Sequence, residues 1–219
     1  MGVNGRLIAP AGRLIATALH PAPTLACDLR GAGVDVAAEV LVGFVGSGKC
    51  LRSTFMFLGW LCGAEPSQAA LRAAASLELL HTFALLQDDV MDGSPLRRGR
   101  ASAHVQFADW HRDRGLSGSA QRFGESAAVL LGDLCLVWAE QMMRGSGLDG
   151  DALSRAWPRY DAMRSELAVG QFADLVNDVG DLPTLDEVLE GARRKSGNYA
   201  PAPARPRAGG HAPPPRRLR

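Results

Sequence analysis

The sequence predicts an all-α protein, and three observations support this. From Val34 onward, long helix-forming stretches are separated by Gly and Pro. Alternating apolar and polar runs of strand composition are limited to one short candidate, Val40–Val45. A composition of 47% hydrophobic and 21% charged residues over 219 residues is that of an ordinary globular domain with a sizeable core.

The periodic stretches predict seven helices, and the residues at their ends support the bounds. Proline suits the first turn of a helix, which favours a start of the third helix at Pro66, and Gly93 with Pro95 ends it. We expect helices over residues 34–45, 49–63, 66–92, 101–113, 121–145, 149–178 and 184–197.

The last two helices carry their own end signals. Asp149 can cap the sixth helix, and Pro158 inside it predicts a kink or a boundary. Thr184 followed by Glu187 is a capping-box pattern, which indicates the start of the seventh.

The two ends of the chain have a different composition from the body. Residues 1–33 are rich in Gly, Pro and Ala, so we expect a loose N-terminal segment. Residues 201–219 hold five arginines, six prolines and no acid, which predicts a disordered tail. Residues 1–200 then carry 19 basic and 23 acidic residues, a formal charge of −4 within a total of +1. This balance argues against a nucleic-acid-binding protein.

Cysteine usage and hydropathy indicate a cytoplasmic protein without stable membrane insertion. The most apolar stretch, Ala127–Ala139, is interrupted by Asp133 and is shorter than a membrane span. No secretory signal is evident. The four cysteines form no CxxC pair and no metal-binding spacing with His, which is typical of reduced thiols: Cys27, Cys50, Cys62 and Cys135.

A nucleotide-binding loop is one alternative. Residues 43–50 nearly match the pattern GxxxxGK[ST], but Cys50 replaces the hydroxyl that would hold magnesium. The loop also needs a parallel sheet, and the chain offers no strands to build one.

An acidic motif ends the third helix. Asp88 and Asp92 are four residues apart, so a helix places both carboxylates on one face, with Asp89 beside them. An incomplete set of hard oxygen ligands suits Mg²⁺, which takes its remaining ligands from water and substrate phosphates. The alternative is a solvated acidic helix end.

Basic residues flank this motif on both sides. His81 lies seven residues before Asp88, which is two turns or about 10 Å along the same face. Arg97 and Arg98 follow the helix end, where a loop can fold them back toward a diphosphate. The alternative for His81 is a satisfied core histidine.

The segment from Leu79 to Gly99 resembles the first aspartate-rich motif of trans-isoprenyl diphosphate synthases, the polyprenyl synthetase family. The resemblance runs over residues 34–200 and implies the N-terminal portion of an isoprenoid-synthase-type helical bundle. Three further pieces follow the family's order: Gly48-Lys49-Cys50-Leu51-Arg52-Ser53, Gly170-Gln171-Phe172-Ala173-Asp174, and Lys195-Ser196-Gly197 with Tyr199.

The resemblance implies a role for each matching residue. Asp88 and Asp92 would coordinate Mg²⁺ ions that bridge an allylic diphosphate, with Asp89 in support. The other contacts of that diphosphate would be Arg97, Lys195, Gln171 and Asp174. Isopentenyl diphosphate would be held by Lys49, Arg52, His81 and Arg98. The residues alone also permit an exposed helix start at Lys49 and Arg52, and a polar stripe at Gln171 and Asp174.

The implied reaction is a condensation of isopentenyl diphosphate with an allylic diphosphate by ionisation, condensation and elimination. Phe83 resembles the aromatic floor that stops growth at geranylgeranyl length, and Ala84 beside it leaves room that a second aromatic residue would remove. The alternative for Phe83 is a core phenylalanine. The family is usually homodimeric, so we expect a homodimer or a hetero-oligomer with a complete synthase.

The chain departs from the family pattern in two ways. Cys50, Ser53, Gln87 and Ala200 stand where the family has Arg, Pro, His and Thr, and no second DDxxD follows Lys195. We therefore expect a C-terminally truncated or frame-shifted member with impaired prenyltransferase activity. The alternative is a non-catalytic diphosphate-binding fragment or partner subunit.

Overall fold

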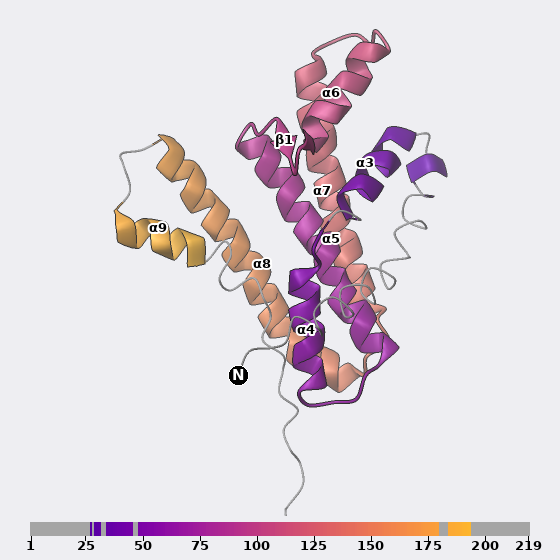
Figure 1. Cartoon of the computed structure of the whole chain (residues 1–219), viewed down its shortest axis with the longest axis vertical. Coiled ribbons are helices and arrows are strands. Elements are labelled where there is room, and N and C mark those ends of the chain that lie inside the picture. The colour runs from indigo at the N-terminus through magenta and orange to yellow at the C-terminus, as the bar shows by residue number, and fades with distance from the viewer. Residues whose placement is uncertain (1–26, 28, 32–33, 46–47, 180–183, 194–219) are drawn as a thin grey trace, which may run out of the picture.

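The computed structural model describes residues 27, 29–31, 34–45, 48–179 and 184–193, and this part is all-α as predicted (Figure 1). The expected N-terminal segment lies mostly, and the expected tail wholly, outside the described residues. The elements are α3 (Asp35–Val45), α4 (Leu51–Leu61), α5 (Gln68–Met91), β1 (Leu96–Arg97), β2 (Arg100–Ala101), α6 (Ala103–Asp113), α7 (Ala120–Arg144), α8 (Gly150–Val179) and α9 (Leu185–Ala192).

The start of α5 differs from the prediction by two residues. Ser67 caps the helix, since its hydroxyl accepts a hydrogen bond from the Ala70 N–H at 3.0 Å. Pro66 therefore precedes the helix and is not in its first turn. Gly93, with φ of +59°, ends the helix as expected, because glycine adopts this left-handed conformation without strain.

The predicted starts of α8 and α9 are confirmed in detail, and the predicted end of the last helix at residue 197 lies outside the described residues. The Asp149 carboxylate accepts from the Ala152 N–H at 2.7 Å, and Thr184 and Glu187 form the reciprocal bonds of a capping box. Pro158 does not divide the helix in two. It lies inside the 30-residue α8, where one proline removes a single backbone hydrogen bond and the turns on either side continue.

The helix predicted over residues 34–45 is confirmed, so the alternative strand at Val40–Val45 is not formed, whereas a hairpin within the described residues was not predicted. Val40–Val45 is helical, because Leu41 and Val45 pack into the core at helical spacing. The hairpin of β1 and β2 turns on Arg98 and Gly99, both with positive φ (54° and 76°), which is the backbone of a two-residue type I′ turn. Only the glycine of this pair is a common turn signal.

The core lies around α5, which packs antiparallel along α7 and also contacts α4 (Figure 1). Leu77, Leu79, Leu80 and Leu86 of α5 are almost completely buried. The approach of α6 to α7 depends on Gly124, because a Cβ there would lie 2.2 Å from the His104 carbonyl oxygen. By length and composition α5 and α7 could cross a membrane, and the apolar windows of these two helices are 67% and 39% buried inside the protein.

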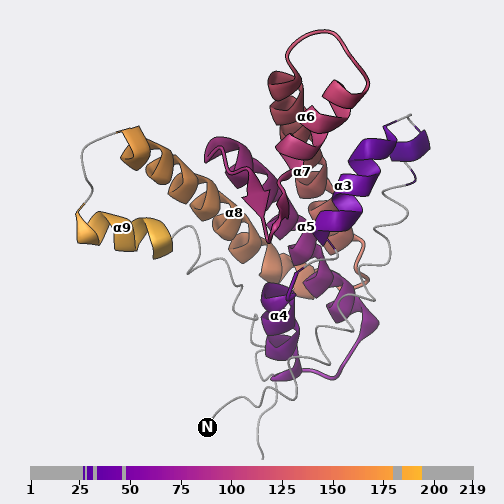
Figure 2. The ribbon, with the colours of Figure 1, turned by 45° about the horizontal axis from the view of Figure 1, so that its top comes forward.

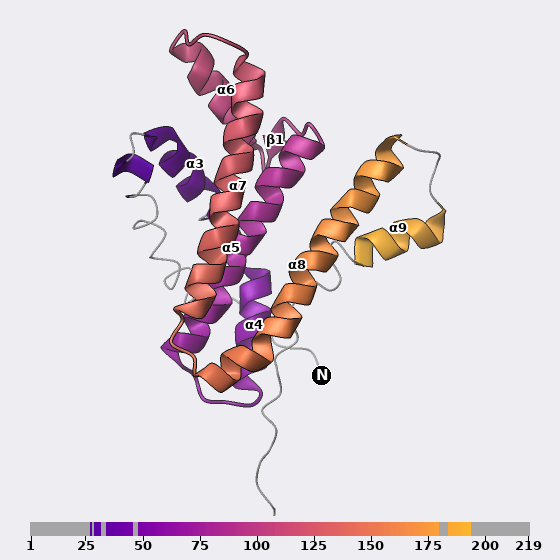
Figure 3. The same ribbon diagram turned by 180° about the vertical axis from the view of Figure 1, so that it is seen from behind.

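The helix α8 diverges from α5 and α7, and α9 folds back beside its far end (Figures 2 and 3). The outer part of this pair exposes several large apolar side chains: Val169, Phe172, Val176, Val179, Leu185, Val188 and Leu189. The architecture is therefore a well-packed group of helices around α5 and a sparsely packed pair, α8 and α9, beside it.

Candidate functional site

The acidic motif lies where the last turns of α5 meet the following loop. Asp92 caps the helix, and its N–H donates to the Asp88 carbonyl at 2.9 Å, so the two residues are one turn apart on one face. Asp92 is exposed and Asp88 is half-buried, whereas the Asp89 side chain is completely buried. Neighbouring acids in the sequence therefore have different environments.

Arg97 of β1 folds back onto the two adjacent aspartates. Its Nε donates to Asp89 Oδ1 at 2.8 Å and its Nη2 donates to Asp88 Oδ2 at 3.1 Å, with a further contact between Nη2 and Asp89. The second oxygen of Asp89, Oδ2, is buried without a hydrogen-bond partner among the described residues. Arg97 was expected at a diphosphate; here it binds the carboxylates.

The donor set of this motif fits Mg²⁺. Asp88 and Asp92 offer hard carboxylate oxygens one helical turn apart, and Mg²⁺ is commonly held by one or two carboxylates plus water and phosphate oxygens. Within the described ranges no group of three or more His, Cys, Asp or Glu side chains is arranged to hold a metal ion. The chain thus offers part of a coordination shell, and the buried Asp89 carboxylate adds negative charge beside it.

A cationic cluster lies on the neighbouring side of α5. The guanidinium Nη1 of Arg52, at the start of α4, lies 3.1 Å from Nε2 of His81. Because arginine can only donate, Nε2 accepts and the imidazole is neutral. Burial, and then the positive charges of Arg52, Arg98 and Arg97, lower the pKa of His81 to about 3. Such a concentration of positive charge suits a polyanion.

Glu78 is a residue of this region that the sequence analysis missed. It is 5% exposed, and the Ser53 hydroxyl contacts its carboxylate and lies 3.0 Å from the Cys50 carbonyl. Glu78 therefore ties the start of α4 to α5. A signal was present, since Glu78 is the one charged residue within the apolar run 73–80.

The loop before α4 carries one further predicted cation, Lys49. Lys49 is exposed. The preceding Gly48 lies close to the side chains of Arg98 and Glu78, because a Cβ added to this glycine would be 3.6 Å from an atom of each. Cys50 follows with a left-handed backbone, φ of 49°. Burial and the Glu78 carboxylate raise the pKa of its thiol to about 11, so this cysteine is not a nucleophile at neutral pH.

The described part of the chain holds only a two-stranded antiparallel sheet, which rules out the parallel sheet of a nucleotide-binding loop.

A pocket of about 720 Å³ opens between α4, α5, α7 and α8. Asp88 and Gln87 line it beside the acidic motif, and Arg52 with His81 line the side of the cationic cluster. Most of the rest of the lining is apolar, and it includes Phe83, Ala84, Leu136, Leu167, Phe172 and Leu175. Both residues expected to limit chain length are therefore on its wall.

Of the three expected contacts from the later part of the chain, Gln171 and Asp174 are described, and they lie in different surroundings. Gln171 lines the pocket, and its buried Nε2 has no hydrogen-bond partner within the described segments. Asp174 lies toward α9, with Oδ1 3.6 Å from the position of a Cβ on Gly191. Lys195 lies outside the described residues.

Gln87 stands where the family pattern has histidine. Its amide donates to Asp133 Oδ1 at 3.1 Å and to the Val129 carbonyl at 3.4 Å, so it joins α5 to α7 just below the acidic motif. This residue therefore has a packing role as well as a place in the pocket wall.

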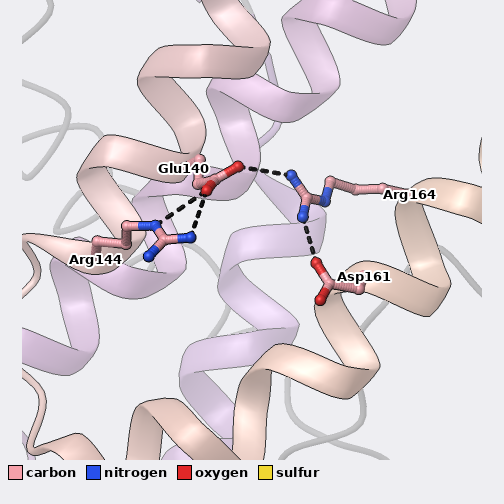
Figure 4. A network of polar contacts seen from close by, with 4 residues as sticks. All are labelled: Glu140, Arg144, Asp161 and Arg164. Atoms are coloured by element: carbon pink, nitrogen blue, oxygen red, sulfur yellow. Dashed lines mark hydrogen bonds and ion pairs between the residues drawn. The ribbon is translucent and has the colours of Figure 1, made fainter.

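A second arginine–carboxylate cluster was not predicted; we call it the Arg164 network (Figure 4). Glu140 of α7 accepts from Arg144 at 2.7 Å and from Arg164 of α8 at 3.0 Å, and Asp161 contacts Arg164. Arg164 also lies 4.5 Å from the centre of the Tyr160 ring. The helical spacings of Glu140 with Arg144 and of Asp161 with Arg164 were signals in the sequence, but the link between α7 and α8 was not.

A family model described as "Polyprenyl synthetase" matches residues 35–208. The chain is 31% identical over 152 residues to geranylgeranyl diphosphate synthase of Mycobacterium tuberculosis, covering 68% of this chain and 38% of that protein. It is 26% identical over 179 residues to nonaprenyl diphosphate synthase of the same organism, covering 81% and 47%. The chain thus spans less than half the length of these relatives.

Among solved structures, the fold is similar to geranylgeranyl pyrophosphate synthase of Corynebacterium glutamicum in complex with isoprenyl diphosphate and magnesium. The TM-score is 0.79 at 31% identity, over 89% of this chain and 56% of that one.

Proposed function

The chain belongs to the polyprenyl synthetase family, and from this premise we propose that it is a prenyltransferase that condenses isopentenyl diphosphate with an allylic diphosphate. One observation carries the proposal. An apolar pocket is bordered by the carboxylate of Asp88 and by the cationic cluster of Arg52 and His81. A substrate with a charged head and a hydrocarbon tail matches this combination.

In this proposal the acidic motif binds the allylic diphosphate. Asp88 and Asp92 would hold Mg²⁺, which supplies positive charge that stabilises the departing diphosphate. Arg97 donates to both Asp89 and Asp88, and it thereby holds the Asp88 carboxylate in place. Arg97 would release one of its two carboxylate partners in order to contact the diphosphate. The buried Nε2 of Gln171 would donate a hydrogen bond to the same diphosphate. Lys195 and Asp174 remain proposed contacts of the same diphosphate.

The cationic cluster would bind isopentenyl diphosphate. Lys49, Arg52 and Arg98 supply positive charge, and the neutral His81 supplies an Nδ1–H donor while its Nε2 accepts from Arg52. Glu78 would position this group by fixing the start of α4. The two diphosphates would thus occupy separate sets of residues on α5 and its neighbours.

The reaction would proceed by ionisation, condensation and elimination. The allylic C–O bond breaks and diphosphate leaves, and the apolar wall around Phe83 and Leu136 excludes water from the resulting cation. The double bond of isopentenyl diphosphate forms the new C–C bond, and loss of a proton restores an alkene. The product expected from Phe83 and Ala84 is of geranylgeranyl length. We further propose a cytoplasmic homodimer, or a hetero-oligomer with a complete synthase.

Incubation with labelled isopentenyl diphosphate, an allylic primer and Mg²⁺ tests the proposal. A longer prenyl product is expected from the purified chain, and Asp88→Asn should lower its rate by about 10²-fold or more through loss of charge stabilisation. Asp113→Asn, an exposed acid at the end of α6, is the matched control and should leave the rate unchanged. Absence of product from the chain alone would contradict prenyltransferase activity of this chain by itself.

A second candidate function is a non-catalytic diphosphate-binding subunit, and the partial set of metal ligands within the described residues, Asp88 with Asp92, favours it. In that case the chain binds an allylic diphosphate with Mg²⁺, forms no product alone, and changes the activity of an added complete synthase. Calorimetric binding combined with the same incubation separates the two candidates.

A further inference from the structure

The contacts between α5 and α7 show how deep in the pocket the Arg164 network lies. Gln87 contacts Asp133, and the Ser76 hydroxyl lies 3.9 Å from Met143 Sδ, so the two helices run antiparallel in a fixed register. This register places Glu140 beside residues 78–80 of α5. With a rise of 1.5 Å per residue, that level is about 14 Å along the helix from Asp88.

Two members of the network form part of the pocket wall. Asp161 and Arg164 line the pocket, whereas Glu140 and Arg144 are outside its lining. Between this level and Asp88 the wall is apolar at Phe83, Ala84 and Leu136, while Arg52 and His81 border the pocket on the side of α4. On the side of α7 and α8 the wall therefore changes from apolar at Leu136 and Leu167 to charged at Arg164 and Asp161.

Arg164 is held in place from three directions. Glu140 accepts at 3.0 Å, Asp161 contacts the other end of the guanidinium, and the Tyr160 ring lies under it at 4.5 Å. Tyr160 is itself 2% exposed, so the arginine rests on a packed support. A hydrocarbon tail that reached this level would remove water from a guanidinium and a carboxylate, which opposes binding.

We propose that Arg164 and Asp161 are specificity-determining residues that limit the length of the prenyl tail the pocket accepts. This inference rests on the proposed function, since it concerns the hydrocarbon part of the same ligand. A tail that passes Ala84 reaches the charged wall after roughly one further helical turn. Replacing Arg164 by an apolar residue would extend the apolar wall on the side of α8, while Arg52 and His81 stay on the side of α4.

Binding of two parallel ligand series tests the inference. The full chain is titrated with geranyl, farnesyl, geranylgeranyl and geranylfarnesyl diphosphates with Mg²⁺, and separately with the four corresponding alcohols. Affinity should rise with tail length and then stop rising at one member of each series. In Arg164→Leu this break should move to a longer tail, with roughly a tenfold gain in affinity for the first ligand beyond the original break.

Two variants control the experiment. Arg144→Leu removes a partner of the same Glu140 but lies outside the pocket lining, and it should leave the break unchanged. Arg164→Leu leaves Glu140 paired with Arg144, so no buried charge loses its last partner. Asp161→Asn tests the other wall residue with almost no change of shape. A cooperative thermal unfolding transition above the temperature of the binding measurement confirms that each variant folds.

The outcomes separate the inference from the proposed function. An unchanged break in Arg164→Leu and Asp161→Asn, with diphosphates bound, overturns the inference and leaves the function standing. A shifted break for the alcohols without binding of any diphosphate supports the charged wall and overturns the prenyltransferase proposal. Binding of neither series overturns both.

Discussion

Two arginine–carboxylate clusters border the same pocket, and they differ in their balance of charge. In the acidic motif Arg97 contacts both Asp88 and Asp89, and the oxygen Asp89 Oδ2 is buried without a hydrogen-bond partner within the described residues. In the Arg164 network, two arginines face two carboxylates. An excess of buried negative charge is tolerated where a cation can bind, whereas a matched set needs no ligand. The first cluster is thus suited to binding and the second to shaping the pocket.

The largest expected effect breaks the first cluster. Arg97→Leu leaves the fully buried Asp89 carboxylate without its partner, which should lower the free energy of unfolding by about 3 kcal/mol or more, measured by urea denaturation. Arg164→Leu should cost about 1 kcal/mol or less, because Glu140 keeps Arg144 and Asp161 is 58% exposed.

A double substitution distinguishes charge from packing in the first cluster. Adding Asp89→Asn to Arg97→Leu removes the buried charge and should restore much of the lost stability. Equal costs for the two arginine substitutions, or no recovery in the double variant, would mean that the two clusters do not differ in the way we describe.

A smaller effect is expected at the cationic side of the pocket, where positive charge surrounds an imidazole. His81 has a pKa of about 3 against an ordinary value of 6.5, so the unfolded chain binds a proton between these values that the folded chain does not. Stability should therefore fall as pH decreases from 6.5, by at most about 1.4 kcal/mol per pH unit and so by at most about 2 kcal/mol at pH 5. NMR titration should find the His81 ring neutral at pH 5. Added inorganic diphosphate should raise the pKa, and a ring that titrates normally without it would refute the burial described here.

The smallest effect is expected within the matched cluster. Glu140→Gln removes the carboxylate shared by Arg144 and Arg164, but these pairs are partly exposed and screened by solvent. Its cost should be less than about 1 kcal/mol by thermal or urea unfolding, and it should shrink further in high salt. A cost as large as that of Arg97→Leu would show that α8 depends on this link for its position.

The sequence predicted the helices of the fold because their periodicity and caps are local signals. Thr184 with Glu187 marked the start of α9 correctly, and Gly93 marked the end of α5. Pro66 misled because its preference for the first turn of a helix was weaker than the capping by Ser67. The run Val40–Val45 was correctly included in a predicted helix, and Leu41 packs from it into the core. Local signals of comparable strength can only be decided by tertiary context.

For the candidate site, the sequence indicated which residues carry charge near the end of α5, but it did not indicate which of them contact one another. Spacing indicated that Asp88 and Asp92 share a face, but it could not tell that Asp89 would be the buried one, since this depends on how Arg97 returns. The link from Glu140 to Arg164 joins residues 24 positions apart across two helices, and no periodicity within one helix predicts it. Pairings that depend on the angle between helices need the fold itself.

The hairpin of β1 and β2 has a mechanical consequence. Its turn directs two consecutive arginines to different neighbours: Arg97 to the end of α5, and Arg98 toward Gly48 before α4. A displacement of this single turn would therefore shift both contacts together. If the two diphosphates occupy these places, binding of one alters the affinity for the other, and thermodynamic reciprocity requires the coupling to be equal in both directions.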